Sequence, residues 1–241
     1  KKVDLHFTVE QGQQAILDAL TPLKSEYLST VKKSFDNRWI DFIPTEGKRS
    51  GAYSSGSAYD VHPYILMNWN DDYESLSTLA HELGHTMHSF YSNANQPFAK
   101  ADYATFVAEI ASTINETLLN NYMVKNAKND DEKFFLLGSY LDLLRTTIFR
   151  QTSFAEFELE IHKRVEEGKP LTGDDLCNIY YDIVKKYYGH DAGHCVVDPY
   201  IQYEWSYIPH FMGYTYYVFQ YSTSLIYATA FAEKIVNEGN P

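Results

Sequence analysis

Residues 70–90 of the chain are NDDYESLSTLAHELGHTMHSF, and their spacing predicts an amphipathic helix. Asn70, Asp71 and Asp72 stand before the first apolar position, where such side chains commonly start a helix. The apolar positions recur every three or four residues, at Leu76, Leu79, Ala80, Leu83, Met87 and Phe90. The segment therefore predicts a long helix with one buried face.

This helix carries an H-E-x-x-H motif formed by His81, Glu82 and His85. Residues four apart lie on the same face of a helix, so the two imidazoles can bind one metal ion. Glu82 is one step round the helix, where its carboxylate can reach a water on that ion without binding the ion itself. The motif predicts a zinc hydrolase, most often a peptidase.

A catalytic zinc site takes three protein ligands and keeps one open position. His88 lies on the same stripe of the helix, but it is about 10 Å from His81 along the axis at 1.5 Å per residue. Three ligands strung so far apart are poorly placed for one ion, so His88 is predicted to pack or to support the site. Tyr91 occupies the position of the third histidine in metzincins, which disfavours that class.

Glu109 is the candidate for the third ligand. Apolar residues at helical spacing flank it within residues 106–116, which predicts an inward-facing carboxylate, and such a group needs a partner. It follows His85 by 24 residues (109 − 85), which leaves room for a turn and an antiparallel return. Two alternatives stay open: Glu116, two turns further on the same face, is the ligand, or Glu109 pairs with a buried base.

The rest of the chain predicts a mainly α protein with a small β element before the motif helix. Short apolar runs at 39–43 and 64–69, set among glycines and prolines, predict strands. A loop is expected at Gly189–Gly193. Helices are predicted from the Thr8 cap to Leu20, from the Thr21-Pro22 cap to about Phe35 and over 101–126. Further helices are predicted from Asp130, with breaks, to Glu167, from the Thr172 cap to Tyr188, and over roughly 213–237.

Composition excludes several classes of protein. The formal net charge of −12 repels phosphate backbones, so nucleic acid is not expected as a partner. The run 205–232 lacks Asp, Glu, Lys and Arg, but its proline, glycine, histidine and tyrosines favour a buried cleft wall over a membrane span. Cys177 and Cys195 are too few for a disulfide framework, and reduced thiols in a cytoplasmic protein are expected.

Several separate segments carry a resemblance to a known family. They are HELGHTMH at 81–88, GKRSGAY at 47–53, HPYIL at 62–66, FVAEIAST at 106–113, IPHF at 208–211 and YYVFQY at 216–221. Together they resemble the oligoendopeptidase F / thimet oligopeptidase family of zinc metallopeptidases, and the match covers nearly all of the chain. Residues 1–241 are expected to form a single catalytic region, truncated at both ends relative to full-length relatives.

The resemblance implies a multi-helix metallopeptidase domain with a deep cleft that acts on short unstructured peptides. Zn²⁺ would be held by His81, His85 and Glu109. Glu82 would act as the general base, taking a proton from water and passing it to the leaving amine. In the family, an N-terminal region that this chain lacks forms the opposite wall of the cleft and is expected to complete it.

Further site residues are expected around the substrate. His210, Tyr214 and Tyr217 are the candidates for stabilising the oxyanion, with Tyr216 and Tyr221 as alternatives. Gly51, Ala52 and Tyr53 are expected to form an edge strand that pairs with the substrate backbone.

Two rival functions remain open at this point. One is a zinc hydrolase of another amide, such as a carboxypeptidase, which would trim single residues from a peptide end. The other is a fragment that binds metal or peptide but lacks a complete cleft.

Overall fold

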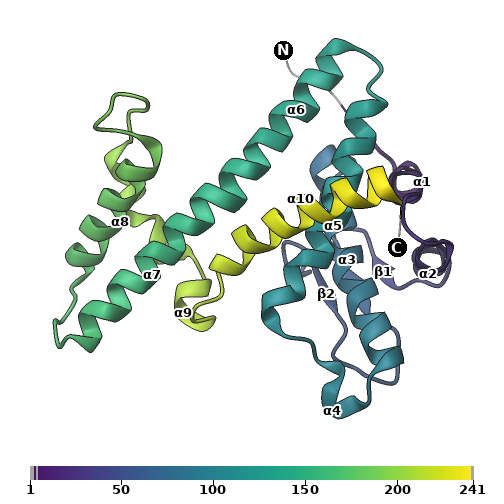
Figure 1. Cartoon of the computed structure of the whole chain (residues 1–241), viewed down its shortest axis with the longest axis horizontal. Coiled ribbons are helices and arrows are strands. Elements are labelled where there is room, and N and C mark those ends of the chain that lie inside the picture. Colours follow the sequence, from purple (N-terminus) through teal and green to yellow (C-terminus); the bar gives the residue numbers. More distant parts are fainter. Residues whose placement is uncertain (1–2, 4, 240–241) are drawn as a thin grey trace. The chain divides into compact units, whose positions relative to one another are not determined.

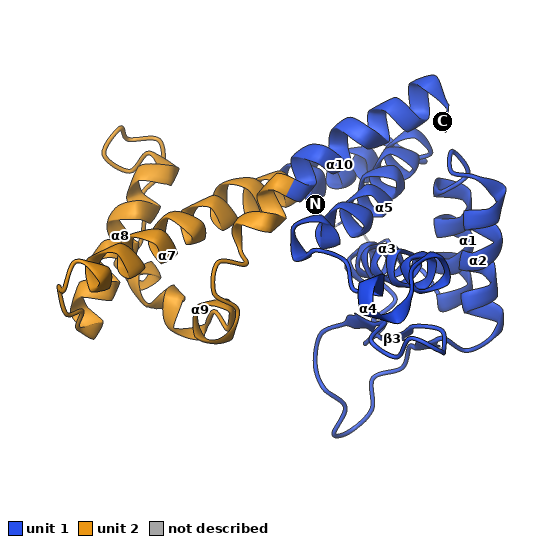
Figure 2. Cartoon of the chain, turned by 60° about the horizontal axis from the view of Figure 1, so that its bottom comes forward, with its two compact units in different colours: residues 1–141, 224–241 blue, residues 142–223 orange. Residues whose placement is uncertain are grey.

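The computed structural model describes residues 3 and 5–239, and most of this part of the chain is helical (Figure 1). The predicted mainly α class is confirmed. The chain divides into two compact units, and each is described by itself (Figure 2). Unit 1 holds the residues up to 141 and those from 224 onward, and unit 2 holds residues 142–223. None of the helices in the described part is both long and apolar enough to cross a bilayer.

Unit 1 begins with helices α1 (Val9–Ala19) and α2 (Ser25–Asp36). Thr8 caps α1 as predicted, because its hydroxyl accepts the Gln11 N–H while the Gln11 side chain accepts the Thr8 N–H. The predicted cap at Thr21 is wrong. Its hydroxyl donates to the Asp18 carbonyl at 2.8 Å, and α2 starts only after Lys24, which makes no side-chain cap.

A small sheet follows, with strands β1 (Ile40–Asp41), β2 (Tyr53–Ser55) and β3 (Tyr64–Leu66) in the order β1-β3-β2. β1 runs parallel and β2 antiparallel to the central strand β3. β1 and β3 lie inside the two runs predicted as strands, and β2 is an edge strand. The expected edge strand at 51–53 is thus displaced: it begins at Tyr53, because Gly51 has a φ of +81°, outside the β region.

The centre of unit 1 is the pair of helices α3 (Tyr73–Asn95) and α5 (Thr105–Lys125), joined by the short helix α4 (Phe98–Ala101). Asp72 caps α3 by accepting the Ser75 N–H at 2.8 Å. The predicted apolar face is buried, apart from Phe90, which is partly buried. Asn115 of α5 donates its side-chain amide to the Ala80 carbonyl of α3 at 3.1 Å. The core around these helices includes Ile16, Leu20, Val31, Trp39, Ile65, Met67, Leu76, Leu79, Leu83, Leu118 and Leu119.

A long helical stretch is divided into α6 (Asp130–Leu144), the π-helical segment η1 (Arg145–Arg150) and α7 (Gln151–Glu166), which matches the predicted helix with breaks. In unit 2, α7 packs on α8 (Gly173–Tyr188), whose predicted Thr172 cap is confirmed. Glu204, on the 3₁₀ helix η2 (Pro199–Tyr207), accepts hydrogen bonds from the Arg150 guanidinium and the Tyr180 hydroxyl. This network anchors η2 to the core of unit 2.

The last predicted helix, over 213–237, starts too early. The structure has a short helix α9 (His210–Gly213), a turn, and then α10 (Phe219–Glu238). Tyr216 has a φ of +56°, which a right-handed helix does not permit, so the tyrosine-rich segment turns instead of continuing the helix. The Glu158 carboxylate supports this turn by accepting the Tyr216 N–H at 2.7 Å.

Candidate metal centre

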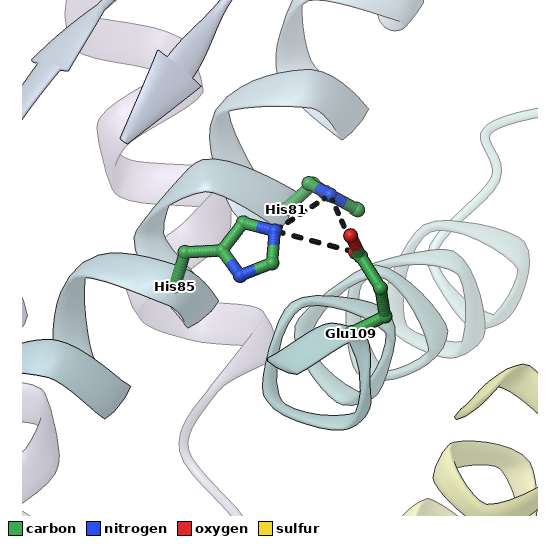
Figure 3. A group of neighbouring side chains, drawn as sticks. All are labelled: His81, His85 and Glu109. Carbon is green, nitrogen blue, oxygen red and sulfur yellow. Dashed lines mark hydrogen bonds and ion pairs between the residues drawn. The ribbon is translucent and has the colours of Figure 1, made fainter. Parts of the chain in front are cut away.

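The two histidines of the H-E-x-x-H motif converge on the surface of α3. His81 and His85 are one helical turn apart, and their Nε2 atoms lie 3.1 Å from each other. Figure 3 shows both rings turned toward the same point beside α5. The sequence spacing alone is sufficient for this part of the arrangement, because helical geometry places side chains at i and i+4 next to each other.

Glu109 of α5 completes the group, as the flanking apolar pattern predicted. Its Oε2 atom lies 3.3 Å from the Nε2 atom of His81 and 3.3 Å from that of His85 (Figure 3). The side chain is buried, with 4% of the residue exposed. The hydroxyl of Ser112, one turn further along α5, donates to the same oxygen at 3.0 Å. Glu109 is thus held in place from its own helix and aimed at the two imidazoles.

The geometry of this group fits a zinc ion. Ligand atoms about 2.0–2.1 Å from a tetrahedral zinc are roughly 3.3 Å apart from each other. The three candidate atoms are separated by 3.1, 3.3 and 3.3 Å. Two imidazoles and one carboxylate also form a ligand set found in catalytic zinc sites. Among the described residues, His81, His85 and Glu109 form the group of side chains suited to holding a metal.

The electrostatics of the group also suit a cation. Burial disfavours the charged form of Glu109, but hydrogen bonds from His81 and His85 outweigh it and hold the pKa of the carboxyl below its usual range. Burial likewise disfavours the imidazolium of His81, yet the carboxylates of Glu116 and Glu109 raise its pKa well above the usual value. Ligation requires the neutral imidazole, so a bound metal ion would take the place that the two carboxylates otherwise favour for a proton on His81.

Glu116, the alternative third ligand, has a different position. Its Oε2 atom lies 3.0 Å from Nδ1 of His81, on the side of the ring away from Glu109, and the Ser77 hydroxyl donates to its other oxygen at 3.4 Å. A carboxylate bonded to the outer nitrogen fixes the tautomer and the orientation of a ligating imidazole. In the sequence, the signal for this supporting position is that Glu116 follows Glu109 by two helical turns on the same face of the helix. His88 stacks its ring on Tyr103, with centroids 3.6 Å apart, consistent with its predicted packing position.

Glu82 lies beside the histidine pair, buried under the edge strand β2. Burial raises the pKa of its carboxyl, while the nearby His81 and His85 act in the opposite direction. The backbone N–H of Ser54 in β2 donates to this carboxylate. The Ser54 and Thr86 hydroxyls are 2.8 Å apart, and this bond connects β2 to α3 next to Glu82. The carboxylate is thus near the candidate metal ligands without belonging to them.

The residues predicted to stabilise the oxyanion, His210, Tyr214 and Tyr217, lie in unit 2 and form a cluster. His210 is surrounded by Tyr214, Tyr217 and Tyr221, with ring centroids 5.6–5.8 Å from its own. Its Nε2 atom is 3.1 Å from the Tyr221 hydroxyl. Tyr216 is not part of this cluster, because its ring lies against His162 instead. Of the two alternative tyrosines, Tyr221 therefore belongs to the cluster and Tyr216 does not.

The chain is similar to several known proteins over nearly its whole length. Peptidase family M3 matches the chain over residues 5–241. Oligopeptidase PepF of Bacillus subtilis is 46% identical over 241 residues, covering 100% of this chain and 35% of PepF. The crystal structure of oligoendopeptidase-F from Enterococcus faecium is 32% identical with a TM-score of 0.61, covering 97% of this chain and 34% of that one. A crystal structure from Chlamydophila abortus is 42% identical with a TM-score of 0.79, covering 97% and 38%. The chain therefore spans little more than a third of the length of these relatives.

Proposed function

Because the chain belongs to peptidase family M3, we propose that it is a zinc endopeptidase that cleaves internal bonds of short unstructured oligopeptides. The observation that carries the proposal is the triangle of His81, His85 and Glu109 ligand atoms, with sides that fit tetrahedral zinc. The name of the Bacillus subtilis relative, an oligopeptidase, supports peptides as the substrate class. A cytoplasmic location and completion of the cleft by a further N-terminal region belong to the same proposal.

His81, His85 and Glu109 would hold the ion, and Glu116 would orient the His81 ring. When bound, zinc supplies Lewis acidity, which lowers the pKa of a coordinated water and polarises a carbonyl oxygen. Glu82 receives the proton of the attacking water and delivers it to the leaving amine. Its place beside the candidate ligands, without belonging to them, suits this exchange.

The edge strand β2 would bind the substrate backbone. One side of β2 is paired with β3, and the Ser54 N–H on its other side faces the Glu82 carboxylate. An extended peptide that added to this edge would bring a scissile bond next to Glu82. In this proposal Tyr53 contributes from the strand itself. Gly51 and Ala52 contribute from the turn before it.

The cluster of His210, Tyr214 and Tyr217 would donate hydrogen bonds to the oxyanion. We expect Tyr217→Phe and Tyr214→Phe to differ, with the true donor losing about 10²–10³-fold in kcat, the usual result of removing one oxyanion donor. Tyr216→Phe is the matched control, since its ring lies outside the cluster. Steady-state kinetics on one peptide would decide the matter, and a normal kcat in both cluster variants would contradict this assignment.

Metal analysis together with mass spectrometry of a digested peptide mixture would test the proposed function. We expect about one zinc per chain, internal cuts in short peptides, loss of cleavage after chelation, and recovery on adding zinc back. Removal of single residues from peptide ends would favour a carboxypeptidase. Bound zinc with no cleavage of any peptide would mean that this chain binds metal without acting as a peptidase.

A further inference from the structure

Gly84, the glycine within the H-E-x-x-H motif, lies where the backbone of α3 approaches the backbone of α5 closely. A Cβ atom built on it would be 2.5 Å from the Ala111 carbonyl oxygen and 2.5 Å from the Ser112 Cα atom. Real Cβ atoms essentially never approach another atom to within 3.0 Å. Both of these neighbours are backbone atoms of α5, so no side-chain rotation can make room for a methyl group.

Conformational freedom does not explain this glycine. Gly84 is in the middle of a regular α-helix, and its φ is not in the left-handed region where glycine is favoured. Within a helix interior, glycine is less favourable than any residue except proline. A residue that weakens the helix is therefore placed where its missing side chain lets two backbones touch.

The contact lies directly next to the third candidate ligand. Ala111 and Ser112 follow Glu109 by two and three residues on α5, and the Ser112 hydroxyl donates to the Glu109 oxygen that faces both histidines. His85 is the residue after Gly84 on α3. The separation of the helices at Gly84 therefore controls the distance from the Glu109 carboxylate to the His81 and His85 nitrogens.

We propose that Gly84 is a positioning residue for the metal centre: it sets the spacing between α3 and α5 at which Glu109 completes the ligand triangle. The proposal rests on the metal centre of the proposed function. A methyl group at position 84 would require α5 to retreat by at least ~0.5 Å, from 2.5 to 3.0 Å. Metal sites hold their ligand distances to within about 0.2 Å, so such a retreat opens the triangle.

Zinc affinity of the whole chain, measured by competition with a chelating dye, is the direct test. We expect Gly84→Ala to weaken zinc binding by about 10–100-fold, the usual range for residues that support ligands. Gly138→Ala is the matched control. It makes the same change inside a helix, but Gly138 is exposed and a Cβ there would meet nothing within 4 Å. Its zinc affinity should equal that of the unmodified chain.

A double-mutant cycle separates positioning from general packing. If Gly84 acts through Glu109, then Gly84→Ala should have little further effect on zinc affinity once Glu109→Ala has removed the carboxylate. A loss of the same factor with and without Glu109 would overturn the proposal. So would an unchanged affinity in the Gly84→Ala single variant.

Folding is checked first by circular dichroism of the metal-free proteins. If Gly84→Ala is unfolded, the titration is repeated in sucrose, which strengthens the folded state. A variant that stays unfolded even then overturns the proposal, because the proposal requires a small helix shift and not loss of the fold. Zinc binding by the unmodified chain distinguishes failure of the proposed function from failure of this inference. If that chain binds no zinc, the proposed function fails. If the unmodified chain binds zinc and Gly84→Ala binds it equally tightly, only this inference fails.

Discussion

Glu82→Gln is expected to lower kcat for peptide cleavage by about 10²–10⁴-fold, the usual contribution of a general base, while the protein still binds zinc. Glutamine has nearly the same shape, and its amide oxygen can still accept the Ser54 N–H, so the local structure should persist. What it lacks is a carboxylate that can take up a proton. Parallel measurements of kcat and zinc content on the same preparation would check the prediction.

The control for this variant is Glu74→Gln, which makes the same change at an exposed position in the first turn of α3. It should leave both kcat and zinc content unchanged. Normal cleavage by Glu82→Gln would show that Glu82 does not transfer the proton. Loss of zinc along with activity would instead assign Glu82 to the metal ligands.

Glu109→Ala is expected to weaken zinc binding by about 10²–10³-fold and to abolish cleavage at zinc concentrations that saturate the unmodified chain. Structural zinc sites, which have four protein ligands, bind with about 10–16 kcal/mol, so losing one ligand should cost roughly 2.5–4 kcal/mol. The two imidazoles of His81 and His85 remain on α3 and should still bind zinc weakly. Isothermal titration with zinc would measure the change.

Glu116→Ala is the matched comparison, because it removes a carboxylate on the same helix that contacts the outer nitrogen of His81 and not the inner one. Its loss should weaken zinc binding by about 10–100-fold, the usual effect of losing such support. Equal losses at both positions, or a larger loss for Glu116→Ala, would contradict the assignment of Glu109 as the ligand.

Much of the candidate site could be predicted from the sequence because it depends on local geometry. The i, i+4 spacing is sufficient to bring His81 and His85 together, and the apolar neighbours of Glu109 indicated that it faces inward. The choice between Glu109 and Glu116 was harder. Both lie on one face of α5, and only the way α5 packs along α3 places one at the inner nitrogens and the other at the outer nitrogen of His81.

The misplaced elements have similar causes. Thr21 lies in the turn that ends α1, where its hydroxyl donates to the Asp18 carbonyl, and α2 begins only at Ser25. The tyrosine-rich segment before α10 has high apolar content and looks helical, but Tyr216 adopts a positive φ supported by Glu158, which is 58 residues away in the chain. Propensities within a short window contain no information about such a distant partner.

The sequence by itself determined the mainly helical fold, the two histidines on one helix face and the inward direction of Glu109, because these follow from the periodicity of a helix. Only the tertiary structure decided the distance between the helices, the support that Glu116 gives to His81 and the contact of Ser54 with Glu82. The physical reason is that these features depend on how closely two backbones approach each other. At Gly84 the backbones of α3 and α5 lie too close to leave room for even one methyl group.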